Sequence, residues 1–207
     1  MNISNNRQIL VLASRSPRRV ELLKQIGIDC VVFPPDIDES FNQDEFPGQY
    51  VRRIAKEKVL VTASNLKEEY SNLVVLAADT AVYVGSKVLG KPVDDADALS
   101  MLKSLSGTKH EVHTAVAAYF GGQMSEVLST TTIEMMRLSD DAINAYIASG
   151  EHRDKAGSYG IQGRAAAWIK HIEGSYSGVM GLPLFEAAQL IEKVVAKSLI
   201  NSKKGKW

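Results

Sequence analysis

Cysteine is scarce in this sequence, and neither sign of charge is in excess. Cys30 is the only cysteine among 207 residues. The chain therefore forms neither an internal disulfide nor a cysteine-based zinc site, which fits a reducing cytoplasm. The 24 lysines and arginines balance the 24 aspartates and glutamates, so the formal net charge is zero. This balance argues against a bulk nucleic-acid-binding protein, although it is compatible with a local basic pocket.

Long apolar runs are absent as well. No segment approaches the roughly 20 consecutive apolar residues that a membrane-spanning helix needs. The first apolar run, Ile9–Ala13, is too short for the core of a signal peptide. We therefore expect an unprocessed cytoplasmic protein with no membrane partner. Because no internal repeat or low-complexity linker interrupts the sequence, residues 1–207 are predicted to form a single domain.

The sequence does contain strand and helix patterns, at an ordinary composition of 45% hydrophobic and 23% charged residues. Strands are predicted at residues 9–13, 31–33, 73–84, 110–120, 124–138 and 167–172, the third with a break at Asp79–Thr80. Helices are predicted at residues 17–27, from near Pro47 to Tyr70, at 94–105, at 139–150 and from Pro183 onward. Gly121–Gly122 predicts a hairpin. Together these patterns predict an α/β (mixed α+β) fold around a mixed sheet.

Hydroxyl and guanidinium groups gather in Ser14–Arg19, between the first predicted strand and the first predicted helix. A helix N-terminus presents unpaired N–H groups and partial positive charge, so it binds phosphates well. Arginines are unfavourable in that first turn unless an anion neutralises them. The segment therefore predicts a phosphate site. The alternative is a solvated helix start that Ser16 merely caps.

Asp79 stands inside an otherwise apolar segment. A carboxylate is costly to bury unless something uses it, so Asp79 is a candidate ligand of Mg²⁺, a candidate general base, or both. The alternative is an aspartate at a strand end that pairs with a nearby lysine.

Two glycine-containing segments are candidates for phosphate binding. Gly85–Pro92 nearly matches the P-loop pattern, but Pro92 replaces the Mg²⁺-binding Ser or Thr. The segment also lies between short strands rather than between a strand and a long helix, so we expect no P-loop. Lys91 can still reach a phosphate as a point charge. In Asp154–Gly163, three glycines at a spacing of three permit close backbone approach, either to a ligand or within a structural turn.

Taken together, these motifs resemble the Maf family of nucleotide pyrophosphatases over nearly the whole chain. The matching segments are SRSPRR at Ser14–Arg19, ADT at Ala78–Thr80, GKP at Gly90–Pro92, SGTKH at Ser106–His110, DKAGSYGIQG at Asp154–Gly163 and GLP at Gly181–Pro183. The resemblance implies a long mixed sheet flanked by helices, with two lobes around a central cleft. It also implies hydrolysis of a nucleoside triphosphate between its α and β phosphates, a divalent metal (Mg²⁺ or Mn²⁺) and a homodimer.

The resemblance implies roles for individual residues. Asp79 would be the catalytic group that activates water, and Glu39 and Asp79 would contact the metal. The loop Asp36–Glu45 offers four acids besides Glu39. The substrate-binding residues would be Ser14, Arg18, Arg19, Lys58, Thr80, Lys91 and Gln162. The residue types at Arg18, Thr80 and Gln162 resemble those of the family branch that acts on dTTP and UTP. A sister branch, which acts on 7-methyl-GTP, carries other residues at the positions of Thr80 and Gln162.

Two other functions remain open at this point. A purine-type pyrophosphatase, of the kind that acts on inosine triphosphate, shares the chemistry. A nucleic-acid-binding or cell-division regulatory module would use the same Ser-Arg cluster on phosphodiesters. The zero net charge and the lack of an aromatic stacking stripe argue against nucleic acid. The expected role is clearance of dTTP and UTP from the nucleotide pool.

Overall fold

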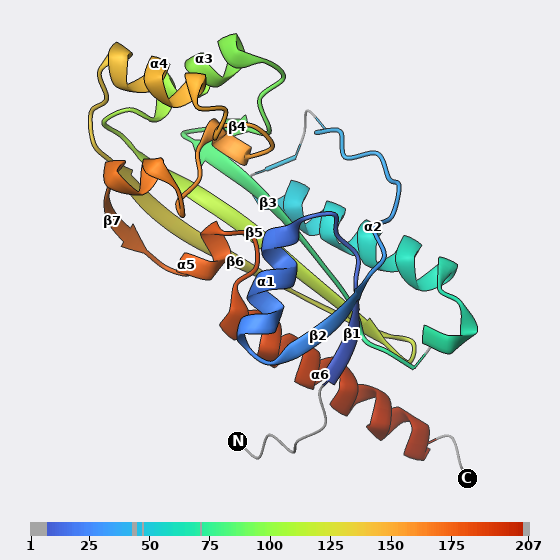
Figure 1. The fold of residues 1–207 in the computed structure, drawn as a ribbon. Coiled ribbons are helices and arrows are strands. Elements are labelled where there is room, and N and C mark those ends of the chain that lie inside the picture. The colour runs from blue at the N-terminus through green and yellow to red at the C-terminus, as the bar shows by residue number, and fades with distance from the viewer. Residues whose placement is uncertain (1–7, 43–44, 47, 71, 205–207) are drawn as a thin grey trace. The chain divides into compact units, whose positions relative to one another are not determined.

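The computed structural model describes residues 8–42, 45–46, 48–70 and 72–204. Its strands are β1 (Gln8–Leu12), β2 (Ile28–Val32), β3 (Val75–Val84), β4 (Lys87–Leu89), β5 (Lys109–Phe120), β6 (Gln123–Met135) and β7 (Ile169–Glu173). Its α-helices are α1 (Pro17–Gln25), α2 (Gln49–Asn65), α3 (Asp95–Leu105), α4 (Asp140–Ala148), α5 (Tyr176–Val179) and α6 (Leu184–Lys204). In the described part of the chain the strands form one seven-stranded sheet in the order β2-β1-β3-β5-β6-β7, with β4 paired to β3 (Figure 1).

The sheet is mixed, as predicted. β1 runs parallel to β2 and to β3, whereas the β3–β4 and β6–β7 pairs are antiparallel. Gly121 and Gly122 form the β5–β6 turn with φ of 53° and 77°, the positive values that a two-residue hairpin turn favours. The prediction of an α/β fold on a mixed sheet flanked by helices is therefore confirmed.

The chain folds into two compact units. Unit 1 contains the chain up to Asp79, residues 115–128 and the chain from Gly181 onward, and unit 2 contains residues 80–114 and 129–180. The prediction of a single domain over residues 1–207 and that of a central cleft stay predictions. No helix in the described residues is long and apolar enough to cross a membrane.

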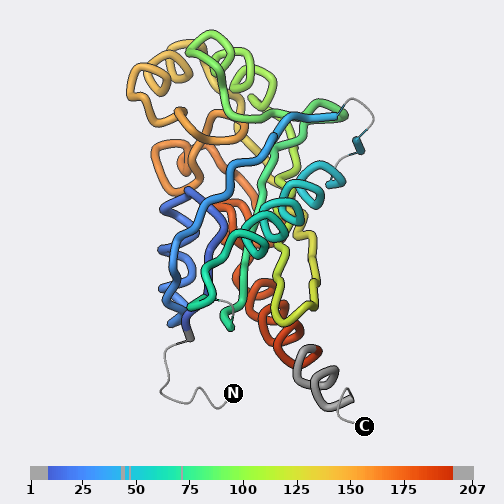
Figure 2. The backbone as a smooth tube through the Cα atoms, turned by 90° about the vertical axis from the view of Figure 1, so that its right-hand side faces the viewer, coloured from blue at the N-terminus to red at the C-terminus, as the bar shows by residue number. Residues whose placement is uncertain are grey.

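Unit 1 is built around β1, whose residues Leu10–Leu12 are buried. Pro17 starts α1 at its first position, and Gly27, with φ of 77°, follows its end. α2 buries a stripe at helical spacing: Val51, Ile54, Ala55, Lys58, Val59 and Thr62. Helix α1 packs against β2, which pairs with β1, and α2 is the second long helix of this unit before β3 (teal in Figure 2). Lys58 thus occupies a core-facing position between apolar neighbours.

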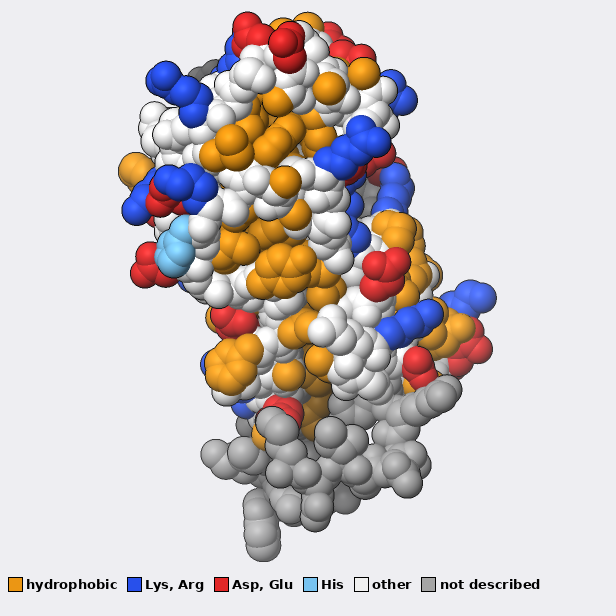
Figure 3. Space-filling view, turned by 60° about the vertical axis from the view of Figure 1, so that its left-hand side comes forward, with side chains coloured by type: hydrophobic (Ala, Val, Ile, Leu, Met, Phe, Trp, Pro, Cys, Tyr) orange, Lys and Arg blue, Asp and Glu red, His pale blue; other side chains and the backbone are white. Residues whose placement is uncertain are grey.

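Unit 2 has its own core, to which α3, α4 and β6 contribute buried side chains. Fully or almost fully buried members include Leu102, Leu105, Met135, Ile143 and Tyr146. Full burial of a leucine, isoleucine or methionine side chain stabilises the folded state by about 1.5–3 kcal/mol. Further hydrophobic side chains pack around this core while remaining partly exposed. Figure 3 shows hydrophobic side chains, in orange, exposed on one face of the molecule.

Some predicted elements differ from the structure. β3 runs without a break through Asp79–Thr80. Residues 164–168 form a 3-10 helix, so β7 begins only at Ile169. α2 ends at Asn65 and a separate 3-10 turn covers Glu68–Tyr70, while Pro47 lies outside the described residues. The short helix α5, capped by the Ser175 hydroxyl, was not predicted.

Candidate active site

Asp79 lies in the interior of β3, at the point where that strand is most apolar. Ala77, Ala78 and Ala81 are almost completely buried, and Asp79 itself is only 7% exposed. A buried carboxylate needs a partner that compensates for its lost hydration. The ammonium nitrogen of Lys58 supplies it, 2.9 Å from Oδ1 of Asp79. The alternative of a strand-end aspartate is therefore wrong about position, although the pairing with a lysine is present.

Burial also changes the chemistry of this carboxylate. Desolvation raises the pKa of Asp79 above its ordinary value, and the positive charges of Lys58 and Arg19 oppose the rise. A raised pKa makes the ionised carboxylate a stronger base. Asp79 is therefore suited to accept a proton at a pH nearer neutrality than an exposed aspartate.

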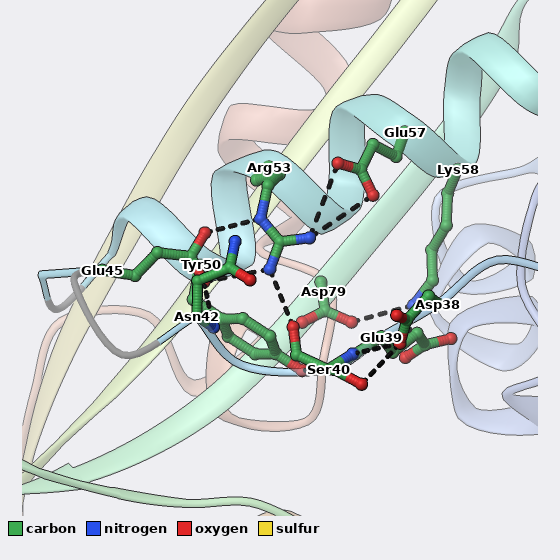
Figure 4. A network of polar contacts seen from close by, with 10 residues as sticks. All are labelled: Asp38, Glu39, Ser40, Asn42, Glu45, Tyr50, Arg53, Glu57, Lys58 and Asp79. Carbon is green, nitrogen blue, oxygen red and sulfur yellow. Dashed lines mark hydrogen bonds and ion pairs between the residues drawn. The ribbon is translucent and has the colours of Figure 1, made fainter.

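Glu39 completes a carboxylate–ammonium–carboxylate arrangement. Its Oε2 lies 3.0 Å from the Lys58 ammonium nitrogen, so one lysine joins Glu39 to Asp79 (Figure 4). Other acids of the same loop are engaged elsewhere: Asp38 accepts from Ser40, and Glu45 binds Arg53. Among the described acids of the loop, Glu39 is the one that reaches Lys58. It is also the acid to which the family resemblance assigns contact with the metal.

Arg19 is the second buried cation of unit 1. Its Nη1 donates to Oγ of Ser14 over 2.9 Å, and its Nε donates to the carbonyl of Gly181 over 2.8 Å. Burial lowers the pKa of Arg19, and the Asp79 charge opposes this. Gly181 belongs to the GLP motif, for which the sequence indicated no role. The structure shows that its carbonyl orients Arg19.

The beginning of α1 differs from a simple capped helix. The Ser16 side chain makes no capping hydrogen bond, so the alternative in which Ser16 merely caps the helix is wrong. Instead the Ser16 N–H donates to Oγ of Ser14 over 3.2 Å. Arg18 is partly exposed, and its guanidinium has no hydrogen-bond or ion-pair partner within the described ranges. An anion at this helix start would meet that guanidinium together with the helix N-terminus.

The structure thus brings Ser14, Arg19, Glu39, Lys58 and Asp79 into one coupled group in unit 1, with Arg18 on the same helix turn as Arg19. Thr80, Lys91 and Gln162 belong to unit 2. They occupy three different segments of that unit.

Thr80 follows Asp79 on β3, so its side chain points to the opposite face of the strand. Its Oγ1 lies 2.9 Å from Oγ1 of Thr114, and Thr114 donates its single hydroxyl hydrogen to the carbonyl of Gly178. Thr80 must then be the donor in the pair with Thr114. The Thr80 hydroxyl hydrogen is therefore used in this pair. Thr114 was not singled out in the sequence, where an isolated strand threonine carries no signal.

Lys91 is exposed at the end of the segment that resembles a P-loop. Gly85, with φ of 59°, lies in the tight turn between β3 and β4, and a β-strand rather than a helix follows. The expectation that this segment is not a P-loop is confirmed. The carbonyl of Gly90 accepts a hydrogen bond from the Gly157 N–H over 3.0 Å, which joins the Lys91 segment to the glycine-rich segment.

The glycine-rich segment is held by the chain itself. Oε1 of Glu151 accepts from the Arg164 N–H over 2.9 Å, and the Tyr146 hydroxyl accepts from the Gly160 N–H over 3.0 Å. A Cβ at Gly163 would clash with Oε1 of Glu151. These contacts favour a structural turn, rather than close approach to a ligand, as the reason for glycine at positions 160 and 163. Gln162 is exposed between them, and its carboxamide makes no hydrogen bond to the described residues.

A metal was expected at Glu39 and Asp79. No group of three or more His, Cys, Asp or Glu side chains gathers in the described part of the chain. Two carboxylates do converge on one cationic centre at Lys58. Mg²⁺ commonly binds through one or two carboxylates, several waters and the phosphates of its substrate. The residues present therefore fit a metal that arrives with a polyphosphate, rather than one held by the protein alone.

The structure is thus that of an α/β protein with a group of paired charges around Lys58 in unit 1. The Maf-like protein family model matches residues 9–194. The chain is 53% identical over 182 residues to the dTTP/UTP pyrophosphatase of Methylobacillus flagellatus, covering 88% of this chain and 90% of the relative. It is 50% identical over 193 residues to the dTTP/UTP pyrophosphatase of Nitrosomonas europaea, covering 89% and 93%. The chain belongs to the Maf family.

A solved structure, that of the Staphylococcus aureus Ham1 protein, aligns with 62% of this chain and 72% of its own chain. Its sequence identity is 17% and the TM-score is 0.39. This similarity is too low to bear on the fold or the function of the present protein.

Proposed function

We propose that this protein hydrolyses dTTP and UTP between the α and β phosphates, releasing the nucleoside monophosphate and pyrophosphate. The single observation that carries the proposal is the buried Asp79 carboxylate joined through Lys58 to Glu39. The relatives at 50–53% identity, which are named dTTP/UTP pyrophosphatases, supply the substrate class.

The reaction needs a base for water and positive charge for the triphosphate. Asp79 accepts a proton from the attacking water, and its burial raises its pKa in the direction that this role requires. The bond that breaks is the P–O bond bridging the α and β phosphates, and its electron pair leaves with pyrophosphate. Arg19 and Lys58 carry fixed charges that offset the negative charge developing on that leaving group.

The proposed cofactor is a divalent cation, Mg²⁺ or Mn²⁺. Glu39 and Asp79 would hold it, and when bound it would neutralise phosphate charge and favour ionisation of water. Lys58 lies within hydrogen-bond distance of both carboxylates and so keeps them together when no cation is present. Lys91, exposed in unit 2, adds a further point charge for a phosphate.

The proposed selection of the base depends on Gln162 and Thr80. Uracil and thymine present an O4 acceptor beside an N3–H donor, and one carboxamide can pair with both. A carboxamide rotated by 180° would suit cytosine instead, so a second group must fix its orientation. Thr80 is suited to that task because its hydroxyl hydrogen is used in the pair with Thr114, so its oxygen would bind the amide NH₂ and not the amide oxygen.

The protein would act in the cytoplasm as a homodimer on free nucleotides, not on nucleic acid. A single cysteine, Cys30, and a net charge of zero support this setting, and the homodimer follows from the family resemblance. Light scattering tests the assembly, since a dimer has twice the chain mass of 22.6 kDa.

The experiment that tests the cleavage site is ³¹P NMR of the products formed from dTTP with Mg²⁺ or Mn²⁺. The proposal predicts thymidine monophosphate and pyrophosphate in equal amounts. Formation of thymidine diphosphate and orthophosphate would show cleavage between the β and γ phosphates and contradict it.

A further inference from the structure

The loop that carries Glu39 is irregular, yet two of its carbonyl groups are held by side chains of α2. The Tyr50 hydroxyl donates to the carbonyl of Glu39 over 2.9 Å. Nη2 of Arg53 donates to the carbonyl of Ser40, also over 2.9 Å. The backbone on the C-terminal side of the Glu39 side chain is therefore fixed at two successive peptide groups. Figure 4 shows Arg53 at the centre of these contacts.

Arg53 makes contacts with all of its guanidinium nitrogens. Nε and Nη2 bind the two carboxylate oxygens of Glu45 at 2.5 and 2.9 Å, a bidentate pair. Nη1 lies 3.4 Å from the nearer carboxylate oxygen of Glu57, one helical turn further along α2. With the bond to the Ser40 carbonyl, all three nitrogens of the guanidinium are engaged, and Nη2 makes two of these contacts. Only a planar fork can make this set, so a lysine cannot replace it.

The other end of the loop is joined to the same network. The second carboxylate oxygen of Glu45 also accepts from the Asn42 N–H over 3.0 Å. The Tyr50 ring, which supports the Arg53 guanidinium at 5.8 Å, meets the Phe41 ring edge-on at 5.6 Å. Bonding to Arg53 lowers the pKa of Glu45, so the pair stays ionised at neutral pH.

We infer that Arg53 is a positioning residue: together with Glu45, it holds the loop at Glu39–Asn42 so that the Glu39 carboxylate reaches Lys58 and Asp79. This inference rests on the proposed function, in which Glu39 contacts the metal. The Glu39 side chain is half exposed, and its contact with Lys58 spans 3.0 Å. A half-exposed ion pair is screened by solvent and contributes too little free energy to order a loop by itself. The contacts of the loop backbone with α2 supply that order.

Activity and metal dependence test the inference. In Arg53→Lys and in Glu45→Gln, we expect kcat/KM for dTTP to fall about 10–100-fold, the usual effect of losing a residue that orients a metal ligand. The Mn²⁺ or Mg²⁺ concentration that gives half-maximal activity should rise in the same variants, while the thermal midpoint changes little. The matched control is Arg52→Lys, because Arg52 lies on the same helix but pairs with Glu126, away from the loop.

A double-mutant cycle separates positioning from general damage. In a Glu39→Gln background, Arg53→Lys should have less than about twofold further effect, because residues that act through one another are not additive. If the double variant loses kcat/KM by the product of the two single-variant factors, the residues act independently and the inference is overturned. An Arg53→Lys variant that behaves like Arg52→Lys would also overturn it. A fully active Glu39→Gln variant would also overturn it, since Arg53 would then have no metal-contacting group to position.

Hydrogen exchange gives a readout that does not depend on activity. Amide exchange across residues 36–42 should rise in Arg53→Lys and stay unchanged in Arg52→Lys. If the wild-type protein fails to hydrolyse dTTP, the proposed function is wrong, yet this measurement still decides whether Arg53 holds the loop. Unchanged exchange in Arg53→Lys contradicts the inference even in a fully active enzyme.

Discussion

The ammonium nitrogen of Lys58 lies 2.9 Å from Oδ1 of Asp79, and both side chains are more than nine-tenths buried. Lys58 faces the core from α2 and Asp79 faces it from β3. An isolated buried charge of either sign would be strongly unfavourable, so each residue makes the other tolerable. The proposed proton transfer to Asp79 depends on this pair.

Replacement of Asp79 by asparagine tests the proposed base. The amide keeps the shape but cannot accept the proton, so kcat should fall by at least about 10²-fold, the low end for a general base. Nucleotide binding should largely remain. The fold should persist, because Lys58 retains its ion pair with Glu39 and the cost of burying the Asp79 charge disappears. A near-normal kcat in a folded Asp79→Asn protein would exclude Asp79 from the mechanism.

The pH dependence follows from the raised pKa of Asp79. Activity should fall as pH decreases through that pKa, at a pH above the ordinary value of about 3.9 for an exposed aspartate. The effect on stability has the opposite sign: ionised Asp79 lowers the free energy of unfolding. This cost shrinks as pH falls through the raised folded-state pKa and vanishes below the unfolded-state pKa of about 3.9. A pH–rate profile whose acid limb lies at or below pH of about 3.9 would contradict the assignment.

The thermal midpoint must be followed over the same pH range, because His110 titrates there. Burial lowers the pKa of His110 to about 4. Neutral His110 therefore contributes stability above its unfolded-state pKa of about 6.5, and that stability is lost as pH falls toward 4. Loss of activity counts toward Asp79 only where the protein remains folded.

Arg18 and Arg19 should respond differently to substitution by alanine. Arg18 has no partner within the described residues, so Arg18→Ala should weaken transition-state binding by about 1.5–3 kcal/mol, as for a charged hydrogen bond, with little change in thermal midpoint. Arg19→Ala should lower both activity and stability, because it removes the buried hydrogen bonds to Ser14 and to the Gly181 carbonyl. Steady-state kinetics and thermal unfolding of both variants check this. An Arg18→Ala protein that unfolds easily but turns over normally would make Arg18 structural.

Gln162→Glu should erode the preference for dTTP and UTP, since a carboxylate cannot donate to O4 of the base. Gln123→Glu, at the β5–β6 hairpin, is the matched control for the added charge. The ratio of kcat/KM for UTP over CTP measures the effect. If both variants keep the wild-type ratio, the base is not selected by Gln162.

Much of the fold was predictable because local signals agreed with it. Asp94 and Ser139 cap α3 and α4 through their side chains, as their positions before apolar helical patterns indicate. The predicted break at Asp79–Thr80 was wrong because the strand is specified by its apolar neighbours, while the partner of Asp79 is 21 residues away. Sequence spacing cannot reveal such a partner.

The supporting contacts of the site were less predictable. Arg53 belongs to a charged helix face that resembles any solvated surface, and its role emerges only where Ser40 and Glu45 fold back onto α2. The bond from Arg19 to the Gly181 carbonyl joins residues 162 positions apart. Lys58 alone carried a usable signal, as a lysine within an apolar stripe at helical spacing.

The most direct test of the central claim is kcat/KM for dTTP, UTP, CTP, GTP, ATP, inosine triphosphate and 7-methyl-GTP, each followed by release of pyrophosphate. The account predicts that dTTP and UTP are hydrolysed at least about tenfold better than the others, which corresponds to roughly 1.4 kcal/mol of discrimination. Equal rates on all of these triphosphates, or a preference for inosine triphosphate or 7-methyl-GTP, would contradict it.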